Sequence, residues 1–327
     1  MSSLSSTSSP SPPPGGSLRL IDIGANLLDS KFSGEYNGSS RHPPDLETVL
    51  RRSLTQYEGH AAEVGGCERV IITAGTLSEA RETLAMCEKI NAKCASKGVA
   101  TTAGFHPTRA TEYEEGLYEH VKENAWPQGD VVALGELGLD YDRLQFSDKE
   151  SQMTSLLAQL AVSERLQSSG VSLPLFIHSR NCGDDLYEVL KDNRSKFPGG
   201  VVHSFDGPLA LAEKYMSLGL YIGLNGCSFR TPENMSVVSQ LPLDRLMLET
   251  DAPWCDIRPT HPGHAHVSTF FEPVKKEKKW EEGCFVKNRT EPCMVVQVLE
   301  VVAGCQGVKV EDVAEACFEN SMKLFFP

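Results

Sequence analysis

The stretch VVALGELGLD (Val131–Asp140) lies near the middle of the chain, and the interpretation of the whole sequence starts from it. An apolar run that ends in a Gly-Glu pair is typical of a strand buried on both faces, with one carboxylate at its C-terminal end. Such a carboxylate must be paired, protonated or bound to a cation, because an isolated buried charge is very costly. Taken alone, the segment favours a partly solvated glutamate, so a metal-binding role for Glu136 depends on the other strands.

Seven further runs resemble strands, and segments with apolar residues at helical spacing separate them. The strand-like runs are 18–28, 69–75, 98–106, 174–178, 200–203, 219–226 and 245–251. Segment 45–64 has the spacing of a helix, and segment 111–124 is the crossover after the third strand. After the last strand we expect an irregular charged loop over 259–289 and two closing helices over 292–303 and 310–326.

This alternation of strands and helices predicts parallel strands joined by right-handed crossovers. The pattern suits either an open doubly wound sheet or a closed (β/α)8 TIM barrel. The count of strands favours the barrel, and so does the position of Glu136, His178, His203 and Asp251 at the C-terminal ends of their runs. In an open sheet laid out in sequence order, the fourth and eighth strands would lie about 19 Å apart at about 4.8 Å per strand. That separation is too large for a shared metal ion, so we expect a barrel.

The composition allows one large domain without a disulfide framework. The chain has 327 residues, 40% of them hydrophobic, and we expect one barrel domain over residues 18–327. Residues 1–17 are rich in Ser and Pro and lack the features of a secretory signal, so we expect a disordered tail. The 10 cysteines include no Cys-x-x-Cys pair, which indicates reduced thiols and an intracellular location in the nucleus, the cytoplasm or both.

The formal net charge of −13 means that the protein as a whole repels polyanions. Binding of a nucleic acid would therefore need a local basic patch or bound cations. The one dense basic run is KKEKKW, residues 275–280. It is either a patch that follows a phosphate backbone, with Trp280 as a stacking ring near the barrel mouth, or a solvated loop, which the adjacent Glu281 and Glu282 favour.

Two histidines and two carboxylates, each at the end of its own strand, form a mixed nitrogen and oxygen donor set. They are Glu136, His178, His203 and Asp251. Such a set suits zinc, manganese, iron or cobalt and is tolerable for magnesium. A single histidine at a strand end is more often structural, and Asp251 before Pro253 is also explained as a helix cap. Glu249 would face the same side as Asp251 and repel it, unless a cation or a basic group holds one of them.

Four motifs in this order resemble the signatures of the TatD family of metal-dependent deoxyribonucleases. They are GELGLD (135–140), HSR (178–180), HSF (203–205) and ETDAP (249–253). The opening DIGANL (22–27) and the Lys-rich stretch before NRTEP (288–292) look most like the eukaryotic branch of the family, that of the TatD DNase domain-containing protein 1. The likeness runs from about residue 18 to the C-terminus.

The resemblance implies a (β/α)8 barrel with two divalent metal ions, magnesium in the first place and manganese or zinc as alternatives. It implies that Glu136 bridges both ions, that His178 and His203 bind one ion, and that Asp251 binds the other. In such a site one ion lowers the pKa of a bound water, and both stabilise charge on the attacking and leaving oxygens. We therefore expect Glu136 and Asp251 to be catalytic, with Asp251 orienting or deprotonating the water.

The chain departs from the wider family on its first strand. Many members carry a His-x-His pair there, whereas this chain has Gly24 and Asn26. We expect this metal position to be weaker, to hold more water and to suit Mg²⁺, which prefers oxygen ligands. Candidates for substrate binding are His106, Arg180 and Asn26, although His106 is equally well explained as a turn histidine.

Three functions are compatible with the sequence. The first is a DNA hydrolase that works from a strand end, as an exonuclease, because its site lies in a pocket. The others are a metal-dependent hydrolase of another ester or amide and a non-catalytic nucleic-acid-binding barrel. We expect a monomer that acts on DNA, without membrane contact or an obligate protein partner. The substitution Glu136→Gln is expected to abolish hydrolysis with little loss of folding, because it removes repulsion between ligands in the metal-free protein.

Overall fold

The structure is a computed structural model that describes residues 18–60, 66–271 and 274–327, so the expected tail (1–17) lies outside the described residues. Its centre is an eight-stranded parallel sheet in which the strands follow one another in the order of the chain. The strands are β1 (Ile21–Ala25), β4 (Arg69–Ile72), β5 (Val99–Ala103), β6 (Val131–Asp140), β7 (Leu175–Arg180), β8 (Gly200–His203), β9 (Tyr221–Leu224) and β10 (Leu246–Leu248). All eight predicted strands are therefore present.

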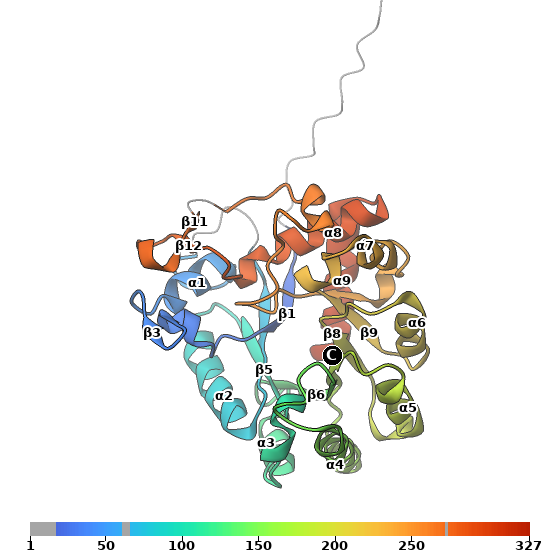
Figure 1. The fold of residues 1–327 in the computed structure, drawn as a ribbon. Helices are drawn as coiled ribbons and strands as arrows, with labels where there is room; N and C mark the ends of the chain where they lie inside the picture. Colours follow the sequence, from blue (N-terminus) through green and yellow to red (C-terminus); the bar gives the residue numbers. More distant parts are fainter. Residues whose placement is uncertain (1–17, 61–65, 272–273) are drawn as a thin grey trace, which may run out of the picture.

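The sheet closes between β1 and the segment that follows β10, so that the strands form a ring (Figure 1). Ala25 pairs in parallel with Ala252, and the Asn26 N–H donates to the Ala252 carbonyl at 2.6 Å. The buried Asp22 carboxylate accepts bonds from the backbone N–H and the hydroxyl of Thr250, at 2.9 and 2.5 Å. The predicted (β/α)8 barrel is confirmed, and the open sheet is wrong.

Helices surround the ring on its outer side (Figure 1). They are α1 (Leu46–Ser53), α2 (Leu77–Asn91), α3 (Leu117–Asn124), α4 (Lys149–Ser168), α5 (Asp185–Asp192), α6 (Leu209–Ser217), α7 (Pro232–Val238), α8 (Val295–Gln306) and α9 (Val310–Phe325). Helix α9 packs against both β1 and β10, as expected of a closing helix. In the described part of the chain no single helix is long and apolar enough to cross a membrane, and the bent pair Pro292–Gln306 and Val310–Phe325 meets that test only when both helices are counted together.

One predicted helix is much shorter than expected. The spacing over 45–64 predicts a long helix, but α1 ends at Ser53, and Leu54 leaves it in an extended conformation to pair with Cys67. The chain turns at Gly59, whose φ of +69° is a conformation that glycine adopts readily. Leu54 is buried without being helical, which explains why its spacing from Leu46, Val49 and Leu50 suggested a longer helix. The end of the predicted helix, 61–64, lies outside the described residues.

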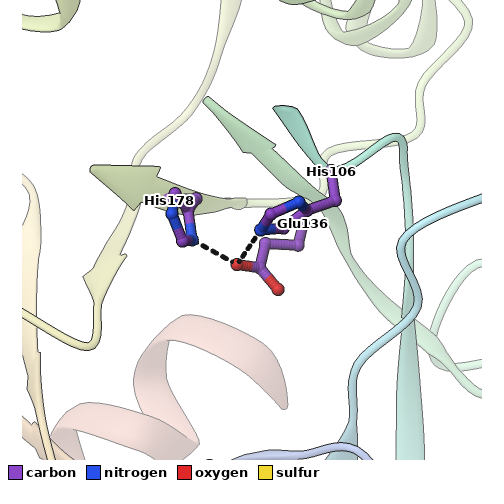
Figure 2. A group of neighbouring side chains, drawn as sticks. All are labelled: His106, Glu136 and His178. Atoms are coloured by element: carbon purple, nitrogen blue, oxygen red, sulfur yellow. Dashed lines mark hydrogen bonds and ion pairs between the residues drawn. The ribbon is translucent and has the colours of Figure 1, made fainter. Parts of the chain in front are cut away.

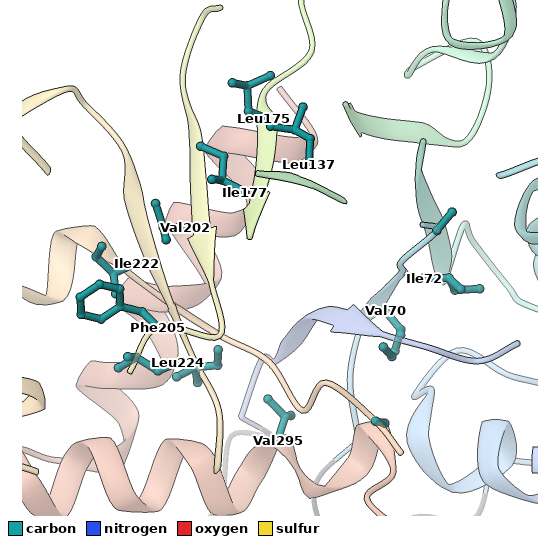
Figure 3. Close-up of a cluster of buried hydrophobic side chains, with 14 of the residues drawn as sticks. Val70, Ile72, Leu137, Leu175, Ile177, Val202, Phe205, Ile222, Leu224 and Val295 are labelled. Carbon is teal, nitrogen blue, oxygen red and sulfur yellow. The ribbon is translucent and has the colours of Figure 1, made fainter. Parts of the chain in front are cut away.

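Two apolar layers follow from the alternation of side chains along each strand. The inner layer fills the barrel and includes Ile71, Val132, Phe176, Val201 and, from α9, Phe325. The outer layer packs beneath the helices and includes Val70, Ile72, Leu175, Ile177 and Val202 (Figure 3). His178 and His203 lie two positions after Phe176 and Val201, so both rings continue the inner layer at the C-terminal end of the barrel.

Strand β6 is irregular at the glycines that flank Glu136. The pairing of β6 with β7 shifts between Gly135 and Leu137. Gly135 and Gly138 have φ values of +149° and +144°, which residues with a side chain rarely adopt. A Cβ atom on Gly138 would lie 2.0 Å from the carbonyl oxygen of His178. The glycines thus allow the strands to approach closely around a bulge, a device that re-aims a side chain, here Glu136.

Buried ion pairs tie the segment before α8 to the start of the barrel. The fully buried Arg289 side chain donates two bonds of 2.8 Å to the Asp45 carboxylate and one of 2.9 Å to Glu291. Arg52 of α1 pairs with Glu291 from the other side at 2.6 Å. Because each charge has partners of opposite sign, the cluster holds its place without an unpaired buried charge.

Candidate metal centre

The C-terminal ends of the strands surround a cavity of about 590 Å³. Its histidine and acidic side chains include His106, Glu136, His178, His203 and Asp251. Its basic side chains are Lys31, Arg143, Arg180, Arg230 and Arg258. The four predicted metal ligands and the three candidates for substrate binding therefore line one cavity, at the barrel end where this fold carries its chemistry.

Three imidazole rings approach one oxygen of Glu136. Glu136 Oε1 lies 2.6 Å from His178 Nδ1, 2.6 Å from His203 Nε2 and 3.4 Å from His106 Nε2. Figure 2 shows His106 and His178 directed at this carboxylate from the ends of different strands. Ligand atoms of His106, Glu136 and His178 all lie within 4.8 Å of one another. This nitrogen and oxygen donor set is suited to a divalent metal ion.

The imidazoles hold Glu136 in its charged form. Burial would raise the pKa of Glu136, but the charge of His203 and the hydrogen bonds from the rings outweigh it, so that this pKa lies well below its usual value. Burial would also lower the pKa of His203, yet the carboxylates of Glu136 and Glu249 raise it well above its usual value. Without a metal ion, Glu136 and His203 therefore form a buried ion pair.

This ion pair overturns one sequence-based expectation. We expected Glu136→Gln to relieve repulsion in the metal-free protein, but the groups closest to Glu136 are imidazoles that attract its charge. The uncharged amide would weaken these bonds, because a hydrogen bond to a charged group is stronger than one to a neutral group. We therefore expect the substitution to destabilise the metal-free protein.

A second carboxylate lies behind each of two histidines. His178 Nε2 is 3.2 Å from Asp140 Oδ2, and His203 Nδ1 is 3.5 Å from Glu249 Oε2. Asp140 and Glu249 are only 1% and 0% exposed. A carboxylate on the outer ring nitrogen fixes the tautomer that leaves the inner nitrogen free for a metal ion. Asp140 had no predicted role, although its even spacing from Glu136 on one strand was an available signal.

Glu249 also explains the departure on the first strand. Its Oε1 accepts bonds from the Ser204 N–H at 2.5 Å and from the Asn225 side chain at 3.0 Å, which offsets its repulsion of Asp251. A Cβ atom on Gly24 would lie 2.9 Å from Glu249 Oε2. The Glu249 carboxylate thus occupies space that a side chain at position 24 would need, so a histidine there would require Glu249 to move.

Asp251 lies at the seam of the barrel. Its Oδ1 accepts a bond from the Asn26 amide at 2.8 Å, and its Oδ2 accepts one from the Cys255 thiol at 3.1 Å. The Asn26 carbonyl oxygen in turn accepts a bond from the Thr73 hydroxyl at 2.8 Å. Burial raises the pKa of Asp251, with the charge of His203 acting against it. Asn26 therefore positions Asp251 in the structure, and its contact with a substrate stays a prediction.

His106 and Arg180 differ in how far they are already engaged. His106 belongs to the cluster around Glu136, and burial lowers its pKa, which favours the neutral ring. Arg180 lines the cavity, and its buried Nε has no hydrogen-bond partner in the described structure. A free guanidinium donor beside the carboxylate cluster is suited to bind an anionic group.

The lysine run does not reach the cavity. Lys275 ends the short strand β11 (Val274–Lys275), and the rest of the run lies between it and β12 (Phe285–Val286). The Trp280 ring stacks on His42 at 5.2 Å, and its N–H donates to Asp45 at 3.1 Å. The interpretation of Trp280 as a stacking ring at the mouth is therefore wrong. The aromatic ring on the cavity wall is Trp254, which is 49% exposed and has the Lys31 ammonium 3.4 Å from its centre.

A closed parallel barrel with clustered histidines and carboxylates at its C-terminal mouth defines the class of metal-dependent barrel hydrolases. Within that class, the chain belongs to the TatD related DNase family, whose model matches residues 21–326. This confirms the family predicted from the four motifs.

Individual relatives agree with this assignment over nearly the whole chain. The protein is 37% identical over 320 residues to the deoxyribonuclease Tat-D of Schizosaccharomyces pombe, which covers 94% of this chain and 96% of the relative. It is 32% identical over 309 residues to the 3'-5' ssDNA/RNA exonuclease TatD of Rahnella sp. (strain Y9602), covering 94% and 98%. The crystal structure of a hydrolase TatD family protein from Entamoeba histolytica superposes with a TM-score of 0.83 at 31% identity, covering 96% of this chain and 100% of that chain.

Proposed function

We propose that the protein is a divalent-metal-dependent deoxyribonuclease that removes nucleotides from the end of a DNA strand. The observation that carries the proposal is the convergence of His178 Nδ1 and His203 Nε2, each at 2.6 Å, on one oxygen of Glu136. Asp140 and Glu249 behind the two rings form the carboxylate–histidine arrangement of metal sites. Family membership favours DNA over the ester, amide and non-catalytic alternatives.

We assign two metal positions to the cavity. Glu136, His178 and His203 would hold one ion, and Asp251 would hold the second together with Glu136. The second position offers mainly oxygen donors, so magnesium or manganese suits it better than zinc. When bound, the ions supply a water of lowered pKa and stabilise charge on the phosphodiester oxygens.

The chain's own groups would place the substrate and the water. Asp251, fixed by Asn26, accepts the proton of the attacking water or orients it. Arg180, whose side chain lines the cavity, donates to a phosphate oxygen. His106, which burial keeps neutral, contributes a ring nitrogen beside Glu136. Trp254 on the wall offers an exposed ring for stacking of a base.

The cavity and its charge favour a single strand end as the substrate. A hollow of about 590 Å³ has the size of a small-molecule pocket, so it takes a terminal nucleotide rather than a duplex. Five basic side chains line it in a protein whose net charge is −13, so attraction of DNA is local. The activity in the name of the Rahnella relative, 3'-5' on single strands, supports the same polarity here.

The test is digestion of oligonucleotides labelled at either end. Pure protein with Mg²⁺ or Mn²⁺ should shorten a 5'-labelled single strand stepwise and release the label of a 3'-labelled strand at once, and a chelator should stop both. His178→Asn should remove this activity. His120→Asn, a substitution of a similarly buried histidine (9% exposed, against 7% for His178), is the matched control and should keep it. Binding of the strand without cleavage under all metal conditions would refute the proposal.

Three further assignments belong to this proposal. Residues 18–327 act as one catalytic domain, because barrel strands and closing helices span 21–325. The protein acts as a monomer, because the chain itself supplies every group assigned to the site. It works in a reducing compartment, the nucleus, the cytoplasm or both, because all its cysteines are free thiols in the structure.

A further inference from the structure

Two thiols on the cavity wall face each other. Cys227 Sγ and Cys255 Sγ are 2.8 Å apart, and both residues are free cysteines that line the cavity. This separation is shorter than an ordinary contact between non-bonded atoms, about 3.5 Å or more, and longer than a disulfide bond of about 2.05 Å. The side chains therefore need only a small movement to form a bond.

The backbone holds the two thiols in this position. Cys227 belongs to a short 3-10 helix, Gly226–Phe229, whose first turn is capped by the Asn225 side chain. A Cβ atom on Gly226 would lie 1.8 Å from the carbonyl oxygen of Cys255, so the two segments touch through their backbones. Asn225 also donates to the buried Glu249 carboxylate at 3.0 Å. These backbone contacts and hydrogen bonds thus hold both thiols on the cavity wall.

Access and charge favour reaction at this pair over the other cysteines. Cys255 is partly exposed and Cys227 is 2% exposed, and both residues line the cavity. The contact with Cys227, burial and the charge of Asp251 raise the pKa of Cys255 well above its usual value. The hydrogen bond from Cys255 and the charges of Arg230 and Arg180 lower the pKa of Cys227, which favours its reactive thiolate. By contrast, burial raises the pKa of Cys87 to a value far above its usual range and that of Cys317 to about 12.

We propose that a peroxide oxidises Cys227 and Cys255 to a reversible disulfide between them, and that this bond weakens metal binding at Asp251. In the first step a sulfur of Cys227 attacks one oxygen of hydrogen peroxide, the O–O bond breaks, and the leaving hydroxide takes up a proton as water. The Cys255 sulfur then attacks the sulfenic sulfur, the S–O bond breaks, and a second water leaves. Two thiols lose two electrons and two hydrogens, and one peroxide becomes two waters.

The effect on the metal follows from the contact between Cys255 and Asp251. In the reduced protein the Cys255 thiol donates to Asp251 Oδ2 at 3.1 Å. A disulfide has no proton to donate, so oxidation removes one of the two bonds that orient this carboxylate. Loss of a group that orients a metal ligand lowers affinity about 10- to 100-fold, and a thiol is a weak donor, so we expect about 10-fold. This second step rests on the proposed role of Asp251, whereas the disulfide does not.

Mass spectrometry tests the disulfide directly. Peroxide is added to the metal-free full chain in chelator, and trypsin should then yield the peptides 215–230 and 246–275, which contain Cys227 and Cys255 as their only cysteines, joined as one product that dithiothreitol separates. Cys94→Ser and Cys305→Ser, which alter other partly exposed thiols, should leave this product intact. No joined product, a bridge between other cysteines, or sulfinic acid at either cysteine without a bridge would overturn the proposal.

Calorimetry with Mn²⁺ alone tests the consequence. The oxidised protein and Cys255→Ala should both bind about 10-fold more weakly than the reduced protein, because both lack the donor. Cys255→Ser keeps a hydroxyl donor and should bind more tightly than Cys255→Ala, also after peroxide. Equal affinity of the oxidised and reduced proteins would overturn the link to Asp251. If the reduced protein did not bind Mn²⁺ but the disulfide formed after peroxide, the proposed metal site would be refuted and the disulfide would be supported.

Discussion

Replacing Glu136 by glutamine should lower the free energy of unfolding of the metal-free protein and should also remove the stabilisation by Mn²⁺. In the metal-free protein, two imidazole nitrogens lie 2.6 Å from the charged oxygen. A hydrogen bond to a charged group contributes about 1 kcal/mol more than one to a neutral group, so the free energy of unfolding should fall by about 2 kcal/mol. With Mn²⁺ at a hundredfold excess over its Kd, the native protein gains about 2.7 kcal/mol. The variant should lose this gain, together with hydrolysis.

Urea unfolding with chelator and with Mn²⁺ measures both steps on the same samples. Glu300→Gln is the matched control, because Glu300 is also 8% exposed and accepts bonds from Ser268 and Thr269 outside the cavity. That variant should lose stability but keep the full gain from Mn²⁺. If metal-free Glu136→Gln were as stable as the native protein, the attraction by the imidazoles would be refuted. If it kept the Mn²⁺ gain, Glu136 would not be a ligand.

Four further outcomes follow from other buried groups. Asp140→Asn should weaken Mn²⁺ binding about 10- to 100-fold in calorimetry, because it removes the carboxylate behind His178; unchanged affinity would contradict that role. The raised pKa of His203 means that the metal-free fold keeps a proton which the unfolded chain loses near pH 6.5, so its stability should fall as the pH rises through the folded pKa. Metal binding must displace this proton, so Mn²⁺ affinity should rise with pH and protons should be released. Calorimetry in buffers of different ionisation heat measures the released protons, and an affinity that does not change with pH would contradict the displacement. Arg289→Met should lower the free energy of unfolding by about 3 to 5 kcal/mol, because it leaves the buried carboxylates of Asp45 and Glu291 without this partner. A loss under 1 kcal/mol in urea unfolding would contradict this, because the carboxylates would then be hydrated.

The fold was predictable because its signals are local. Each strand is an apolar run with a clear end, and counting such runs distinguishes a barrel from an open sheet. The helix over 45–64 was the main error, since buried Leu54 has helical spacing from Leu50 but lies outside α1, where it pairs with Cys67. Periodicity reports burial, and burial alone does not fix the backbone conformation.

The site was predictable only in part, for a physical reason. His203 ends its strand as predicted, whereas His178 lies two residues and Glu136 four residues before the last residue of its strand. The role of Glu249 depends on its approach to His203 at 3.5 Å from a strand two places away in the sheet. The contact of Cys227 with Cys255 depends on two loops that meet only in the folded barrel. Contacts of this kind are set by tertiary packing, and no local pattern encodes them.

The seam between β1 and the segment after β10 has a consequence for synthesis of the protein. Asp251 receives its bond from Asn26, 225 positions earlier in the chain. A ribosome-bound chain that has emerged only as far as β9 therefore has an open edge on each side and carries Glu136, His178 and His203 but lacks Asp251. Arg289, which anchors the later segment to Asp45, emerges later still. A nascent chain of this enzyme therefore has an incomplete site until almost all of it has left the ribosome. This delays cleavage of nucleic acid at the place where the protein is made.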